Sequence, residues 1–218
     1  MKNCVLIMLF VIGLSGCATG PNAPKLVRYG KSTNPMTVQN VGQSVDVRED
    51  EFRKITFITP IDRGEYKFMP KITLEPYIAY SSYSDKVMRL KVRYDGDSWV
   101  FFDKLSVICP KKKRVDLKFN SFKKYTDVYG GGKVIEKYDI VVDKRTINKL
   151  ANCENGKIRV SGKKYFDDKL ELSDATRFSE VLFLFKGLGP KRLSAIKSAR
   201  DEWLKSPKRN RKIASTKK

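Results

Sequence analysis

The stretch that decides the fold is Val87–Tyr94, with the sequence VMRLKVRY. Apolar residues occupy every second position from Met88 to Tyr94, and Arg89, Lys91 and Arg93 lie between them. A period of two with one polar face is typical of an antiparallel strand that buries one side. The stretch therefore predicts a half-buried β-strand with a basic stripe on its exposed face.

Similar segments surround this strand. Residues 115–119 and 157–161 alternate in the same way, and the more continuously apolar runs at 55–58, 99–108 and 134–142 predict more fully buried strands. Turn-forming residues separate them, at 95–97, 130–132 and 155–156. Seven to nine short strands predict a mainly β domain over residues 51–172, built as an antiparallel β-sandwich or a small barrel.

Three tyrosines of this region, Tyr77, Tyr80 and Tyr83, invite a functional interpretation as the lining of a ligand groove. Their spacing of three does not fit one face of a strand. A surface or loop position explains them at least as well.

The apolar period changes after Leu172. A first helix is predicted with Phe178, Val181, Leu182 and Phe185 along one stripe, and Ser173 or Asp174 as its cap. Gly187-Leu188-Gly189 ends it, and Pro190 suits the first turn of a second helix. We therefore expect a helical hairpin over residues 173–206, followed by a basic, disordered tail at 207–218.

The N-terminus has the architecture of a secretory signal. Lys2 precedes an apolar run of about eleven residues that ends at Leu14. As a helix, this run rises only about 16 Å, roughly half of the thickness of a bilayer core. The segment therefore favours a cleaved signal peptide at residues 1–16 over a membrane span.

The end of this segment, Leu14-Ser15-Gly16-Cys17, resembles the lipobox of bacterial lipoproteins. The resemblance implies that Cys17 carries lipid, which would make the membrane a partner of the chain through this anchor. Ala18 after the cysteine, where an aspartate would imply retention at the inner membrane, implies the outer membrane and a domain that faces the periplasm. Residues 17–50, rich in Gly, Pro, Asn, Ser and Thr, are predicted to form a lipidated flexible tether. This organisation is similar to that of small lipoproteins of uncharacterised β-rich families, a likeness that carries no activity with it.

Two further cysteines, Cys109 and Cys153, belong to the predicted β-rich domain. An even pair in an exported, oxidising compartment is expected to form a disulfide, and two buried free thiols are the alternative.

Charge and composition bound the function. The net charge of +21 favours an anionic partner such as lipid headgroups, a cell-wall polymer or nucleic acid. The chain has no histidine, which excludes Ser-His-Asp and Cys-His catalysis and the usual zinc ligand sets. No other pair of nucleophile and base is recognisable, so we expect a protein that is not an enzyme, with no cofactor and no metal site.

The segment Phe185–Ile196 resembles the hairpin of the helix-hairpin-helix family, in which glycines let backbone amides face a DNA phosphate. The resemblance implies phosphate contacts at Gly187, Gly189, Lys191 and Arg192. A purely structural hairpin is the alternative. The leading hypothesis is thus a lipid-anchored envelope lipoprotein with a non-enzymatic binding or structural role, ahead of an envelope-located DNA-binding protein and of an enzyme.

Overall fold

The computed structural model describes residues 37, 44–61, 70–81, 83, 86–110, 113–120 and 124–205. The predicted signal peptide at 1–16, the lipid-attachment residue Cys17, most of the 17–50 tether and the 207–218 tail lie outside these residues.

The first of two antiparallel sheets has six strands in the order β1-β2-β3-β4-β8-β7. They are β1 (Val45–Asp50), β2 (Ile55–Pro60), β3 (Lys71–Ser81), β4 (Val87–Gly96), β7 (Lys124–Tyr129) and β8 (Lys133–Val141). The strand predicted at Val87–Tyr94 is confirmed as β4, which lies inside the sheet between β3 and β8. Its apolar residues Met88, Leu90, Val92 and Tyr94 are all buried, as the alternation predicts.

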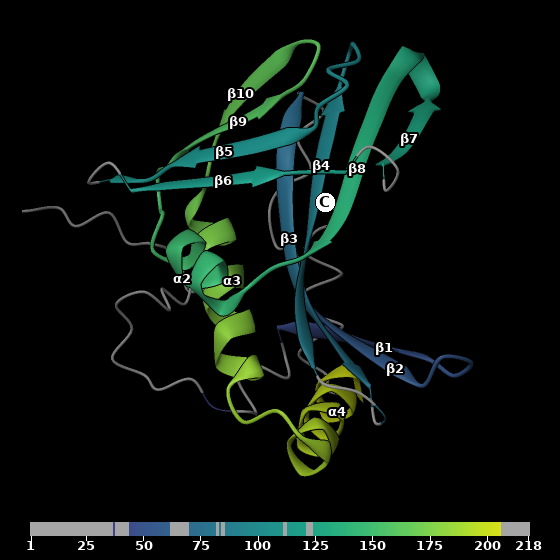
Figure 1. Cartoon of the computed structure of the whole chain (residues 1–218). Helices are drawn as coiled ribbons and strands as arrows, with labels where there is room; N and C mark the ends of the chain where they lie inside the picture. The colour runs from purple at the N-terminus through teal and green to yellow at the C-terminus, as the bar shows by residue number, and fades with distance from the viewer. Residues whose placement is uncertain are drawn as a thin grey trace, which may run out of the picture.

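The second sheet has four strands in the order β10-β9-β5-β6. They are β5 (Lys104–Ile108), β6 (Arg114–Lys118), β9 (Lys157–Ser161) and β10 (Tyr165–Lys169), and they run across the first sheet near one end of it (Figure 1). The Ile72 amide of β3 donates a 2.8 Å hydrogen bond to Asp168 of β10, which joins the two sheets. Neither sheet closes on itself within the described residues, so the barrel alternative is not seen, and the β-sandwich stays a prediction.

Three α-helices complete the described fold: α2 (Lys144–Ala151), α3 (Leu172–Phe185) and α4 (Pro190–Lys205). Helix α3 packs against α2 and β3, and α4 packs against β1 at the other end of the molecule (Figure 1). One core unites both sheets and α3, since Leu90 of β4, Leu105 of β5 and Phe178 of α3 are each completely buried in it.

The structure corrects several boundaries. Strand β1 lies inside the predicted tether of residues 17–50, because Val45 is fully buried in the core. The region 51–172 contains helix α2, whose first turn is capped by Asp143 accepting a 2.6 Å bond from the Thr146 amide. The two helices predicted within 173–206 are present as α3 and α4; α3 packs mainly on α2 and β3, α4 contacts β1, and Arg192 of α4 bonds back to the Phe183 carbonyl of α3.

Two predicted turns differ in their outcome. Gly130–Gly132 does connect β7 to β8, and Gly131 and Gly132 have positive φ angles of 80° and 76°. In contrast, the turn predicted at Asp95-Gly96-Asp97 does not begin until Asp97, because β4 continues through Gly96 and pairs there with Val134 of β8.

Candidate functional site

The most buried acidic group among the described residues is Glu136 on β8, whose exposed fraction is 0%. Its carboxylate accepts three backbone hydrogen bonds from consecutive residues: Val100 at 2.6 Å, Phe101 at 2.8 Å and Phe102 at 3.1 Å. A carboxylate that leaves water needs such partners, because an unpaired buried charge is expensive. Glu136 therefore fixes the 99–103 segment onto the first sheet.

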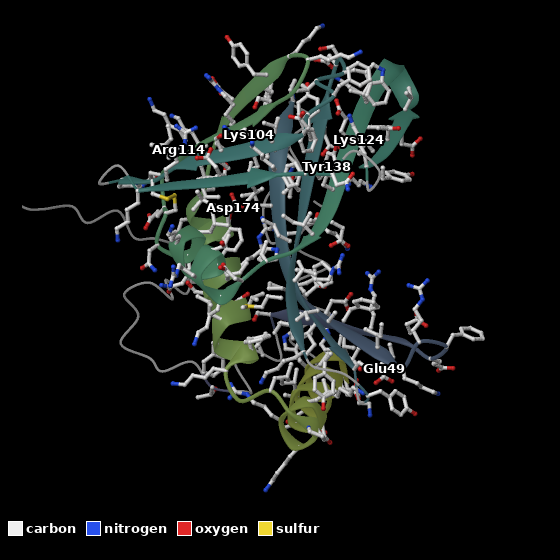
Figure 2. All side chains as sticks on the ribbon, in the orientation of Figure 1. Glu49, Lys104, Arg114, Lys124, Tyr138 and Asp174 are labelled. Atoms are coloured by element: carbon white, nitrogen blue, oxygen red, sulfur yellow. A yellow bond between two sulfur atoms is a disulfide. The ribbon has the colours of Figure 1, made fainter. Side chains whose placement is uncertain are left out.

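The charge of Glu136 is balanced by Lys124 of β7, whose Nζ lies 2.5 Å from Oε2 of the carboxylate. The Lys124 side chain is only 13% exposed. Figure 2 labels Lys124 and Tyr138 near this end of the first sheet, and the Tyr138 ring stacks on Phe119 with centroids 4.6 Å apart. The Lys124 ammonium also lies 5.0 Å from the Phe101 ring centroid and 5.9 Å from that of Phe102, so aromatic rings lie beside the buried ion pair.

The anchored segment holds Phe101 in an unusual backbone conformation, with φ at +53°. This left-handed region costs a residue with a side chain about 1–2 kcal/mol. Gly162, which follows β9, makes room for it: a Cβ at position 162 would lie 2.0 Å from the Phe101 carbonyl oxygen. The fold accepts strain here, and that strain turns Phe101 outward while Val100 and Phe102 remain buried.

The outcome is an aromatic surface open to solvent. Phe101 is 45% exposed and its ring stacks on Trp99, with centroids 5.7 Å apart and an interplanar angle of 23°. The Lys163 ammonium lies 5.1 Å from the Phe101 ring centroid, and the Lys164 amide donates to the Val100 carbonyl at 3.2 Å. We call Trp99, Phe101, Lys163 and Lys164 the Phe101 platform.

A hollow of about 470 Å³ lies over this platform. It is lined by Asp97, Ser98, Trp99, Phe101, Gly132, Val134, Lys163 and Lys164. Asp97 forms an ion pair with Lys133, whereas no described carboxylate pairs with Lys163 or Lys164. The platform can therefore stack a ring and attract an anion at the same time.

The basic stripe predicted on β4 does lie on the face of the sheet opposite the buried residues, but most of its charge is used within the fold. Arg93 forms a bidentate pair with Asp95, and Arg89 bonds to Asp139 at 3.0 Å. The Lys91 ammonium lies 5.0 Å from the Tyr77 ring centroid.

The three tyrosines do not share a groove. Tyr77 is buried on the same face as Arg89, and its hydroxyl donates to Asp139 at 2.7 Å; burial, helped by this carboxylate, raises the pKa of Tyr77. Tyr80 lies on the opposite face of β3, and Tyr83 is 82% exposed beyond the end of that strand.

The disulfide expected between Cys109 and Cys153 is present. It joins the end of β5 to the residues that follow α2, across a sequence separation of 44. Gly156 is needed beside it, because a Cβ there would lie 2.6 Å from the Cys153 sulfur.

The residues proposed for phosphate contact lie between α3 and α4. Gly187 has a φ of +75°, Gly189 precedes Pro190, and the exposed Lys191 lies in the first turn of α4. The Arg192 guanidinium turns back to α3 instead of facing outward, donating to the Lys186 carbonyl at 2.7 Å and the Phe183 carbonyl at 3.2 Å. It therefore serves as a C-terminal cap of α3.

Another hollow, of about 410 Å³, lies between α4 and the β1–β2 hairpin. Glu49 and Lys197 form an ion pair across it, and this contact lowers the pKa of Glu49. Figure 2 shows Glu49 at the opposite end of the molecule from Lys124. The hollow is thus bridged by the chain's own charges.

The sequence analysis missed every residue of the Phe101 platform. It interpreted residues 99–108 as one strand, whereas β5 begins only at Lys104. A usable signal was Glu136, one of two acids in the apolar run 134–142, which alternates with Val134 and Tyr138 and so shares their face. A buried acid needs several donors, and these have to come from a segment that is not occupied in a strand ladder.

None of the described helices is long and apolar enough to span a bilayer. In the same described residues, no group of three or more His, Cys, Asp or Glu is arranged to hold a metal ion. No protein-family model matches the chain, and neither a curated protein nor a solved structure matches it.

Proposed function

We propose that this chain is a lipid-anchored protein of the cell envelope, attached to the outer membrane through Cys17 and facing the periplasm. Its β-rich domain has a non-enzymatic binding role, and the Phe101 platform is its binding site.

The location is supported by the lipobox-like Leu14-Ser15-Gly16-Cys17 and by the pairing of Cys109 with Cys153. Structural disulfides persist in exported proteins and are rare in reducing compartments. A chain with a net charge of +21 is also suited to an envelope rich in anionic lipid and polymer.

The binding role depends on one observation above all, the outward presentation of Phe101. Phe101 has a φ of +53° and is 45% exposed beside Lys163. The close contact that Gly162 permits and the buried Glu136 carboxylate together hold it in this conformation. Backbone strain of this kind is common at functional sites, and Phe101 is the one such non-glycine residue among the described residues that line the hollow.

The alternative of a DNA-backbone contact at Gly187, Gly189 and Lys191 has less support. Arg192 is used within the fold, because its guanidinium bonds to the carbonyls of Lys186 and Phe183 at the end of α3.

The anchor is tested with Cys17→Ala, and Cys4→Ala, in the predicted signal, is the matched control. We expect a metabolically supplied fatty acid to label the parent and Cys4→Ala chains, and signal cleavage and labelling to be lost in Cys17→Ala. Equal labelling of all three chains would rule out Cys17 as the anchor.

The binding role is tested in cells through Ser98→Cys, an exposed position in the lining of the hollow. A thiol reagent should label this cysteine more slowly in the envelope than in the purified protein, because bound ligand covers it. Ser198→Cys, on an exposed position of α4, is the control and should react equally in both settings. Equal rates at Ser98→Cys would contradict the binding role.

A further inference from the structure

We infer that the Phe101 platform binds an acidic saccharide, a sugar ring that carries a phosphate or a carboxylate. The inference rests on the proposed binding role and adds the chemical class of the ligand.

The stacked rings supply the surface for the sugar. The faces of aromatic rings are electron-rich, and the C–H groups on the face of a sugar ring are weakly positive, so the two pack together favourably. Trp99 and Phe101 stack within 23° of parallel, and both line the hollow. A volume of about 470 Å³ is within the range of small-ligand pockets.

The two lysines supply the charge that selects an acidic ligand. Lys163 and Lys164 follow Gly162 in the turn between β9 and β10, and both line the hollow. The remaining charges nearby are neutralised in pairs, Asp97 by Lys133 and Lys124 by Glu136. Among the described residues, no carboxylate pairs with Lys163 or Lys164, so these two lysines give the hollow its positive charge.

The polar lining suits hydroxyl groups. Ser98 offers a hydroxyl, and Asp97 offers a carboxylate held by Lys133. These groups supply hydrogen-bond donors and acceptors beside the stacked rings, and the hydroxyl groups of a sugar need both.

Single-stranded nucleic acid is the competing ligand, because it also stacks on aromatic rings and binds lysine. It needs a continuous row of open rings along a basic groove. The exposed rings of Tyr125 and Tyr165 are not in the lining of the hollow, which contains the rings of Trp99 and Phe101. A bounded hollow lined by one aromatic pair favours a single sugar unit.

The test measures Trp fluorescence and calorimetric binding with the full chain, purified from membranes in a non-ionic detergent. The probes are glucose 6-phosphate and glucuronate, compared with glucose, inorganic phosphate and a ten-residue oligothymidylate. We expect either acidic sugar to bind at least about tenfold more tightly than glucose or phosphate, because only the acidic sugars engage both rings and lysines.

Variants assign the binding to the platform. Lys163→Gln with Lys164→Gln should weaken acidic-sugar binding about tenfold. Lys149→Gln with Lys157→Gln removes the same charge at two exposed positions elsewhere and should change nothing. Phe101→Gly removes the ring while keeping a residue that tolerates the positive φ; it should lose binding with an unchanged far-UV circular dichroism spectrum.

Equal affinities for glucose and glucose 6-phosphate would overturn the inference. It would also be overturned if the oligothymidylate bound more tightly than the acidic sugars and Lys163→Gln with Lys164→Gln abolished that binding. Absence of binding by every probe would also overturn it. If Ser98→Cys is still protected in cells in that case, the ligand class is wrong and the binding role stands. If that protection is absent as well, the proposed function fails too.

Discussion

Replacing Glu136 by glutamine keeps the size of this buried side chain and removes its charge. The glutamine retains one carbonyl oxygen for the amides of Val100, Phe101 and Phe102, where the carboxylate offered two charged oxygens. It also leaves the largely buried Lys124 ammonium without its partner.

The expected magnitude follows from these contacts. Hydrogen bonds to a charged group contribute about 1.5–3 kcal/mol each, and removing one partner of a buried ion pair costs about 3–5 kcal/mol. Because these values overlap and the glutamine keeps part of the bonding, we expect a loss of about 3 kcal/mol in the free energy of unfolding. For a domain of this size, that loss lowers Tm by about 6–12 °C.

The assay is urea unfolding of the oxidised protein, followed by far-UV circular dichroism. Glu154→Gln makes the same chemical change at an exposed position after α2 and should stay within about 0.5 kcal/mol of the parent. Lys124→Met, combined with Glu136→Gln, removes the unpaired charge and should lose less stability than the sum of the single variants. A Glu136→Gln protein as stable as Glu154→Gln would refute the reasoning that Glu136 holds the 99–103 segment.

Three further perturbations probe other parts of the fold. Replacing Cys109 and Cys153 together by serine should lower the free energy of unfolding by about 4 kcal/mol on the loop-entropy scale, measured by the urea midpoint of the two forms; a midpoint equal to that of the parent would contradict it. Asp143→Ala should cost about 1 kcal/mol, because the Thr146 amide loses its cap acceptor; calorimetric Tm checks this, and an unchanged Tm would count against the cap. The Glu49–Lys197 pair lowers the pKa of Glu49 from its ordinary 4.5. The stability that this pair contributes is therefore present above pH 4.5 and is lost as the pH falls through the lowered pKa. Hydrogen exchange of the α4 amides, corrected for intrinsic rates, should therefore become faster as the pH is lowered from about 5 to 3. An equal change in the Glu49→Gln protein would exclude this pair as the cause.

The predictable part of the fold is the part with a simple period. The alternation around Leu90 identifies the buried face of β4, and Phe178 and Val181 identify that of α3, because side-chain direction follows directly from sequence position in a regular element. The two cysteines were also interpretable, since few outcomes are available to an even pair.

The unpredicted part depends on contacts between distant residues. Trp99–Asp103 has the composition of a strand, but Glu136, more than thirty residues later, takes up three of its amides. Strand β3 contains Pro76 and polar residues that obscure its alternation, and β1 falls in a region whose composition is that of a linker. No local pattern encodes these partners, so the candidate site emerged only in three dimensions.

The strand order also determines what the chain experiences while it is being made. Strands β1 to β4 can pair in the order of their synthesis, and so can β5 with β6. The second edge of β4 stays unpaired until β8 has been synthesised, and the second edge of β5 stays unpaired until β9 has been synthesised. Until residues 133–161 have followed, each half-built sheet presents an open row of backbone groups, the kind of edge that recruits strands from other molecules. Cys109 is likewise without its partner for the same interval. A helper that shields unpaired strands during synthesis should therefore matter more to the yield of this protein than to its final stability.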